Sequence, residues 1–146
     1  MASKTFTLSD TTPATASTAV GSKSGSLDAY DGFIIDADLV GATGGTLDVY
    51  LQRKIDDDKW RDWLHFPQLG AAAAAIRYSV STAPGIANTI VVVGVGTDAT
   101  ATPALAANTF IGGHPGTQLR AVYVAGASTS AGAAIAIRIR CWNRRV

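Results

Sequence analysis

Residues 133–142 read AAIAIRIRCW, and this stretch decides the fold class. Apolar residues occupy every second position from 135 to 141. The residues that alternate with them are Ala136, Arg138, Arg140 and Trp142. Successive side chains of an extended strand point to opposite faces, so this period of two separates an apolar face from a basic one. The stretch therefore predicts a strand that lies on a hydrophobic core with one face and presents arginines on the other.

Other segments of strand length surround this one in the sequence. They are residues 30–40, two runs within 46–66, and residues 76–81, 88–95 and 119–125. Because turn residues and no long helical pattern separate them, the sequence predicts an all-β, antiparallel β-sandwich, jelly-roll-like, with seven to eight strands. The predicted core consists of Phe33, Ile35, Leu47, Val49, Leu51, Val91, Val93, Ile135, Ile137 and Ile139.

Residues 46–66 predict a β-hairpin, because an aspartate-rich turn at 56–59 separates two strand-like runs. The second run does not keep a single phase. Trp60, Leu64 and Phe66 share one parity, whereas Trp63 has the other. A β-bulge, which inserts one extra residue into a strand, accounts for such a change of phase.

Residues 1–29 are rich in Ser, Thr and Ala, and we interpret them as an extended N-terminal arm ahead of a β-sandwich domain at 30–146. The alternation around Phe6 and Leu8 predicts an edge strand, added either to the chain's own sheet or to a neighbour's. Few large apolar residues offset the cost of ordering this arm, so we expect another chain to order it. The connection at 97–116 is long for a compact domain, and residues 102–108 have the signals of one short helix.

Composition excludes several classes of partner. The formal net charge is +1 and only 16% of residues are charged, so no overall basic field attracts nucleic acid or an anionic membrane. No apolar run approaches the roughly 20 residues of a transmembrane helix, and the polar N-terminus lacks a secretory signal. We therefore expect a protein made and used without export. The single cysteine, Cys141, excludes an internal disulfide and a multi-cysteine zinc site.

Enzymatic chemistry has little support in the sequence. His65 and His114 are the two histidines, and neither lies in a nucleophile, metal or phosphate motif, so we predict no catalytic residue and no cofactor. The carboxylates at 56–58 and the pair Asp36 and Asp38 offer oxygen ligands for calcium. The turn lacks the spacing of an EF-hand loop, which favours a solvated hairpin tip.

Two surfaces remain as candidates for binding. The first is an aromatic platform for sugars made of Tyr50, Trp60, Trp63 and Trp142. Trp60 and Trp63 differ by three positions, so without a bulge they point to opposite faces, and at least one belongs to the core. This parity argues against the platform.

The second candidate surface is the basic C-terminal end with its tryptophan. Four arginines on a nearly neutral protein bind nucleic acid weakly, so a docking surface for an acidic patch on another protein is the better interpretation. A solvated sheet face is the alternative. The interface candidates are Phe6, Leu8, Arg138, Arg140, Trp142, Arg144 and Arg145.

The hairpin also carries a resemblance to a known class of proteins. Its first strand reads LDVYLQ at 47–52, an aspartate-rich turn follows, and its second strand reads WRDWLHF at 60–66. This pattern resembles small virion structural proteins of tailed bacteriophages, although the DDDK at 56–59 stands where those proteins commonly have a glycine turn. The likeness covers about 20 of the 146 residues.

The resemblance implies a capsid decoration, or cement, protein with a jelly-roll core on the surface of the head shell. Its implied partner is the major capsid protein. The resemblance also implies that the protein forms a homo-oligomer, either a dimer or a trimer, on the capsid surface of the virion, and that it is made in the host cytoplasm. Placement in the neck, tail or a head fibre stays open. The alternative function is a carbohydrate-binding or fibre module that recognises host glycans or joins virion parts.

Overall fold

The computed structural model describes residues 3–14, 16–40, 45–55, 58–70, 75–81, 105–111, 113–126 and 134–143, of which 75–81 are described by their backbone. Within these ranges the chain forms nine strands and no helix, which confirms the all-β prediction. The strands are β1 (Ser3–Thr11), β2 (Thr18–Lys23), β3 (Gly32–Val40), β4 (Leu47–Lys54), β5 (Trp60–His65), β6 (Ala75–Ser81), β7 (Thr109–Phe110), β8 (Gln118–Ala125) and β9 (Ala134–Trp142).

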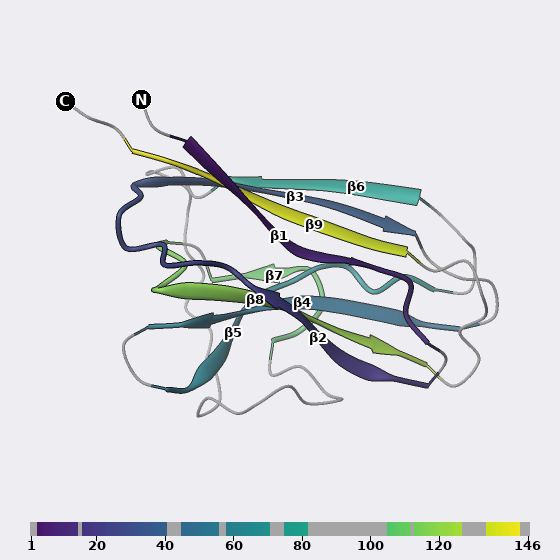
Figure 1. The fold of residues 1–146 in the computed structure, drawn as a ribbon. Helices are drawn as coiled ribbons and strands as arrows, with labels where there is room; N and C mark the ends of the chain where they lie inside the picture. The colour runs from purple at the N-terminus through teal and green to yellow at the C-terminus, as the bar shows by residue number, and fades with distance from the viewer. Residues whose placement is uncertain are drawn as a thin grey trace.

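The strands form two sheets that pack face to face (Figure 1). The four-stranded sheet has the order β1-β9-β3-β6 and the five-stranded sheet the order β2-β8-β4-β5-β7. All the pairings are antiparallel. Four of them are nested along the chain, because β1 pairs with β9, β2 with β8, β3 with β6, and β4 with β5. A long hairpin wrapped around a core gives this nesting, so the sandwich is jelly-roll-like as predicted, with the two-residue β7 as an extra edge strand.

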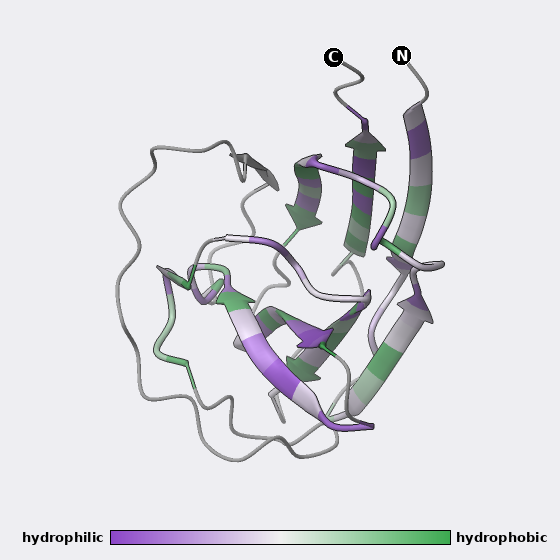
Figure 2. Cartoon of the chain, turned by 90° about the vertical axis from the view of Figure 1, so that its left-hand side faces the viewer, coloured by the Kyte–Doolittle hydropathy of each residue, from purple (hydrophilic) through white to green (hydrophobic). Residues whose placement is uncertain are grey.

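The core lies between the sheets, where the alternation of each strand directs its apolar side chains. Bands of opposite hydropathy along β3 and β9 make this visible (Figure 2). Among the ten predicted core residues, the eight within the described ranges are all buried. Val91 and Val93, with the predicted strand at 88–95, lie outside the described residues.

The hairpin at 46–66 is confirmed, including its bulge. Leu51 pairs with Leu64, whereas Gln52 pairs with Asp62, so Trp63 is the extra residue on β5. The bulge lets both Trp63 and Leu64 join the core, where Trp63 is fully buried. An unbroken strand would have pointed one of these neighbours outward.

The expectation that another chain orders the N-terminal arm is wrong. Residues 3–11 pair with β9 and residues 18–23 pair with β8, so this segment supplies one edge strand to each sheet of the chain's own sandwich. Leu8 belongs to the hydrophobic core, and its side chain is 0% exposed to solvent. Backbone pairing within the sandwich, together with this burial, offsets an ordering cost that the sparse apolar content alone does not.

The described end of the long connection is also ordered by the sandwich itself. Leu105 is buried, β7 pairs with β5, and the Ile111 amide donates to the Trp63 carbonyl at 3.0 Å. The helix predicted at 102–108 is not formed over its described part, 105–108, which is a turn. Asn108 there has a φ of 61°, a left-handed conformation that asparagine tolerates and that a helix does not continue. No helix among the described residues is long and apolar enough to cross a membrane.

Candidate functional site

The outer face of the four-stranded sheet carries the predicted basic surface. On β9, Arg138 and Arg140 are exposed and Trp142 is half-buried, while the isoleucines between them face the core. The sequence therefore placed these three residues on the correct face. Arg144 and Arg145 lie outside the described residues.

The Trp142 indole lies against Gly32 of the neighbouring strand. A Cβ atom at Gly32 would lie 2.2 Å from Cε2 of the Trp142 indole, so only glycine leaves room for the ring. Gly32 and Ser3 flank Trp142 in register on either side. The indole thus forms one wall of an open depression of about 350 Å³, lined by Ser3, Ile34, Arg140 and Trp142.

The two arginines of this face have different electrostatic surroundings. Arg138 lies opposite Asp36 in register, so a carboxylate is its cross-strand neighbour. Arg140 instead lies between Ile34 on β3 and Thr5 on β1. In the part of the chain that the structure describes, no carboxylate forms an ion pair with Arg140. The depression therefore combines an aromatic surface with an unpaired cation, the two side-chain types that are enriched at protein interfaces.

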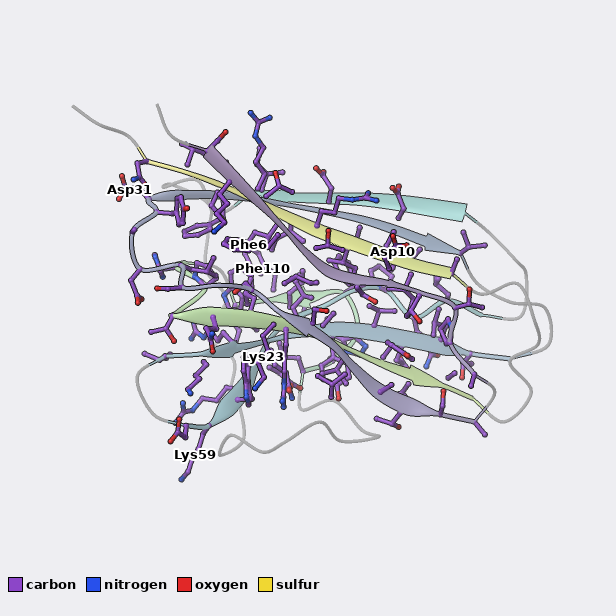
Figure 3. All side chains as sticks on the ribbon, viewed as in Figure 1. Phe6, Asp10, Lys23, Asp31, Lys59 and Phe110 are labelled. Atoms are coloured by element: carbon purple, nitrogen blue, oxygen red, sulfur yellow. The ribbon has the colours of Figure 1, made fainter. Side chains whose placement is uncertain are left out.

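Phe6 and Leu8, the interface candidates of the N-terminal arm, do not lie on this face. Leu8 is buried in the core, and Phe6 packs against the core with its ring 2.8 Å from an ideal Cβ at Gly25 (Figure 3). The Lys4 ammonium lies 4.8 Å from the centre of the Phe6 ring. The parity of β1 explains this placement, because Phe6 pairs with the inward-facing Ile139.

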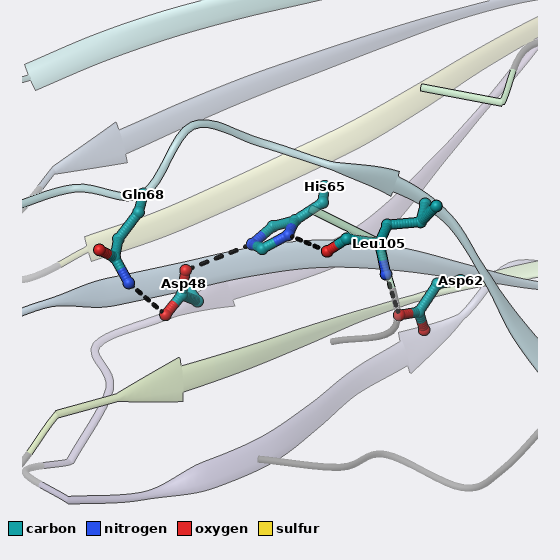
Figure 4. Close-up of polar contacts among 5 residues, drawn as sticks. All are labelled: Asp48, Asp62, His65, Gln68 and Leu105. Carbon is teal, nitrogen blue, oxygen red and sulfur yellow. Dashed lines mark hydrogen bonds and ion pairs between the residues drawn. The ribbon is translucent and has the colours of Figure 1, made fainter. Parts of the chain in front are cut away.

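The outer face of the five-stranded sheet carries a second group of polar residues, which are buried. His65 is 4% exposed, and its Nδ1 donates to the Leu105 carbonyl at 2.8 Å. Its Nε2 lies 3.3 Å from Oδ1 of Asp48, whose Oδ2 accepts a hydrogen bond from Gln68 at 2.8 Å (Figure 4). The Leu105 amide reaches Oδ2 of Asp62 at 3.4 Å. These contacts hold the segment that contains Leu105 against the sheet.

The same face continues with a row of polar side chains across three strands. Arg120 on β8 donates two hydrogen bonds, at 3.0 and 2.8 Å, to Oε1 of Gln52 on β4. Gln52 in turn donates to Oδ1 of Asp62 on β5 at 2.9 Å. The Arg120 guanidinium lies 4.4 Å from the centre of the Trp60 ring. Gln52, Asp62, His65 and Arg120 are buried and Asp48 is half-buried. We call these five residues the buried polar network.

Sequence reasoning missed the buried polar network because the alternation of β4 gives Asp48 and Gln52 the phase of a solvent-facing surface. The one local signal is the concentration of polar residues with large aromatics on that phase, at Tyr50 and Trp60. Both aromatic residues are buried, at 0% and 5% exposure. Burial of this phase shows that other segments cover the sheet.

The burial of these aromatics overturns the sugar-binding platform. Tyr50, Trp60 and Trp63 are all buried, and they leave Trp142 as the one member with a partly exposed ring. Trp63 belongs to the core, as the parity argument required of at least one tryptophan. A flat aromatic surface made of these four side chains therefore does not exist.

The two histidines are both engaged through both ring nitrogens. His65 uses them on Leu105 and Asp48, as described above. In His114, Nε2 donates to the Tyr30 carbonyl at 3.3 Å and Nδ1 accepts from the Gly116 amide at 3.1 Å. A general base needs a free nitrogen within reach of a substrate proton, and neither imidazole offers one in this arrangement.

The calcium candidates and the cysteine complete the predicted sites. Among the described residues, no group of three His, Cys, Asp or Glu side chains is placed to hold a metal ion, and residues 56–57 lie outside them. Cys141 faces the core with 0% exposure, and burial raises the pKa of its thiol to about 11 although the Lys4 charge acts in the opposite direction. The thiol is therefore an apolar core group at neutral pH.

Comparison of the chain with models of protein families, with curated proteins and with solved structures finds no match.

Proposed function

We propose that this chain is a non-enzymatic structural protein of a bacteriophage virion, a capsid decoration protein that stabilises the head shell. The observation that carries the proposal is the depression on the outer face of the four-stranded sheet, where Trp142 is seated on Gly32 beside the unpaired Arg140. The sequence resemblance of the hairpin at 46–66 supplies the class of assembly. The engaged nitrogens of His65 and His114 support a role without catalysis.

The depression suits a protein surface with a carboxylate and an apolar rim. Arg140 supplies a charge-assisted donor for the carboxylate, and the indole of Trp142 with Ile34 supplies apolar contact. We infer that the partner is the major capsid protein, and that the docked chain is present as a homo-oligomer, dimer or trimer, on the outer surface of the shell.

A shell gives a weak contact of this size a large effect. Association costs on the order of 4 to 15 kcal/mol, which one small depression does not offset against an isolated subunit. A repeated lattice raises the effective concentration of neighbouring contacts, so several weak contacts made together retain the protein. Docking is therefore expected on assembled shells and not on free capsid subunits.

The test removes the protein from particles, adds it back, and measures co-sedimentation and the temperature at which the shells fail. Restored shells should fail at a higher temperature than stripped ones. Arg140→Glu should abolish both retention and protection, because it places a negative charge against an acidic partner. The matched control is Lys23→Glu, an equal charge reversal at an exposed position of β2 in the other sheet, and it should behave as the wild type.

Two outcomes contradict the proposal. Stripped and restored shells that fail at one temperature would remove the stabilising role. Equal retention of the Arg140→Glu and wild-type proteins would remove the depression as the docking site.

A further inference from the structure

A second depression lies at the side of the sandwich where β1 and β2 are the outermost strands of their sheets (Figure 1). It has a volume of about 290 Å³, and its lining includes Ser9, Asp10, Thr11, Ser22 and Tyr123. Unlike the depression beside Trp142, this one has a mainly polar lining of hydroxyl-bearing residues and one aspartate, to which Val20 and Gly21 also contribute.

Irregularities in both edge strands build this depression. The register of β1 against β9 shifts between Thr7 and Ser9, so that Leu8 and Ser9, neighbours in sequence, are both buried. The register of β2 against β8 shifts between Val20 and Lys23, on the facing strand. Bulges at sheet edges redirect side chains, and here they turn Ser9 toward the gap between the two strands.

Gly21 allows the two edge strands to approach each other closely. A Cβ atom on Gly21 would lie 2.2 Å from the Leu8 carbonyl oxygen, so any other residue would push β2 away from β1. Gly21 is itself one of the residues that line the depression. The shape of the site therefore depends on a glycine and two bulges rather than on a flexible loop.

Several polar groups in the depression have unfilled hydrogen-bonding capacity. Ser9 is 4% exposed, and its Oγ has no hydrogen-bond partner. Within the described part of the chain, the Asp10 carboxylate and the Tyr123 hydroxyl also form no hydrogen bond or ion pair. A buried hydroxyl without a partner costs free energy, and a ligand that supplies a partner recovers that cost.

We propose that the β1–β2 depression binds a neutral saccharide. Serine, threonine and tyrosine hydroxyls both donate and accept, and the Asp10 carboxylate accepts, which matches a ligand whose own hydroxyls do both. Val20, 43% exposed at the rim, and the Tyr123 ring supply the apolar contact that the C–H face of a sugar ring uses. The volume lies just below the usual range for drug-sized ligand sites, which suits a single sugar unit.

The lining disfavours other ligands. Calcium takes six to eight oxygen ligands and usually several carboxylates, whereas Asp10 is the one carboxylate among the described residues of the lining. Phosphate and other anions are bound through arginine or lysine, and the described part of the lining contains neither. This inference does not rest on the proposed capsid role, because the linings of the two depressions share no residue.

The experiment measures saturation transfer by NMR from the full chain to a panel of methyl glycosides of glucose, galactose, mannose, rhamnose and N-acetylglucosamine. At least one glycoside should receive magnetisation from the protein. Asp10→Asn should weaken its binding by about 10-fold, the lower end of the effect of losing one charge-assisted hydrogen bond. Asp10 is exposed on an edge strand, labelled in Figure 3, so this variant should fold normally. The matched control, Asp36→Asn on the outer face of β3, should bind as the wild type.

Ser9→Ala separates a binding role from a structural one. If the unpaired hydroxyl serves a ligand, its removal should weaken glycoside binding while leaving the melting temperature of the free protein unchanged or higher. A fall in melting temperature would show that the hydroxyl stabilises the fold, and would overturn its assignment to the site.

Other outcomes also overturn the proposal. They are no transfer to any glycoside at concentrations on the order of 10 mM, binding unchanged by Asp10→Asn, or calcium binding that Asp10→Asn removes. Binding lost in Arg140→Glu but kept in Asp10→Asn would place the sugar on the Trp142 face instead, and would leave the capsid proposal to its own test.

Discussion

The outer faces of the two sheets have the same origin in sequence and differ in exposure. On β9, the residues between the core positions, Arg138 and Arg140, are exposed. On β4, the residues between the core positions, Tyr50 and Gln52, are 0% and 1% exposed. Alternation determines which side chains share a face, but it does not determine whether another segment covers that face. The four-stranded sheet therefore has an exposed outer face, on which we propose docking, while the outer face of the five-stranded sheet is buried and carries the buried polar network.

The largest expected effect tests the two faces of β9 with neighbouring residues. Ile137→Asp places an unpaired carboxylate between Ser9 on β1 and Ala37 on β3 in the core, so it should destabilise by about 4 kcal/mol or more and unfold the domain. Arg138→Gln, one residue away on the exposed face, should change stability by less than about 0.5 kcal/mol. Urea unfolding followed by circular dichroism measures both, and a folded Ile137→Asp protein with the wild-type midpoint would contradict this core.

The next effect distinguishes the covered face from the exposed one. Gln52→Ala removes the two hydrogen bonds that Arg120 donates to Gln52 and the one that Asp62 accepts from it, all within a buried layer. We expect a loss of about 2 to 4 kcal/mol, because buried charged groups are costly when their partner is removed. Thr7→Ala, on the exposed face of β1, is the matched control and should cost little. Equal losses in the two variants would mean that the network does not stabilise the covered face.

Much of the core could be predicted from sequence because alternation is a local property. Ile35, Leu51 and Ile137 each face inward for reasons contained in their own strand. The bulge at Trp63 could also be predicted from the sequence, because the apolar residues of β5 change their alternation phase within six positions.

The missed features depend on partners distant in sequence. β2 contains a single large apolar residue, Val20, and becomes a strand through its pairing with β8, about a hundred residues later. His65 acquires its role only when Leu105, 40 residues away, lies over the sheet. The inward position of Ser9 follows from a register shift against β9 that nothing in residues 3–11 marks. The alternation along a strand predicts which side chains share a sheet face. Whether another segment covers that face, which register the strands adopt and which polar groups come together are properties of the assembled sandwich.

A third prediction concerns pH and the apolar face of β9. Below the ordinary pKa of 9.0, the Cys141 thiol is protonated in both the folded and unfolded states and stability does not depend on it. Because burial raises its folded pKa to about 11, the unfolded state releases this proton first as the pH rises from 9 to 11, and stability falls over that window. The loss should approach roughly 2 to 3 kcal/mol above pH 11.

Cys141→Val isolates this contribution from the lysines and tyrosines that titrate in the same range. The difference in unfolding free energy between wild type and Cys141→Val should be constant up to about pH 9 and then move in favour of the variant. The wild-type thiol should also react with a disulfide reagent only after denaturation. A difference that stays flat to pH 11 would show that the thiol is less buried than its position in the core indicates.

The smallest expected effect on stability is at the residue with the largest proposed effect on docking. Arg140 is exposed, lies between Thr5 and Ile34, and forms no ion pair within the described chain, so Arg140→Ala removes no interaction that the folded state depends on. The unfolding free energy should therefore stay within about 0.5 kcal/mol of the wild type. Retention on shells should nevertheless fall, because the same side chain supplies the cation among the described lining residues of the depression. A variant that loses stability and retention together would make Arg140 a structural residue, and would remove the distinction between an exposed face used for docking and a covered face used for stability.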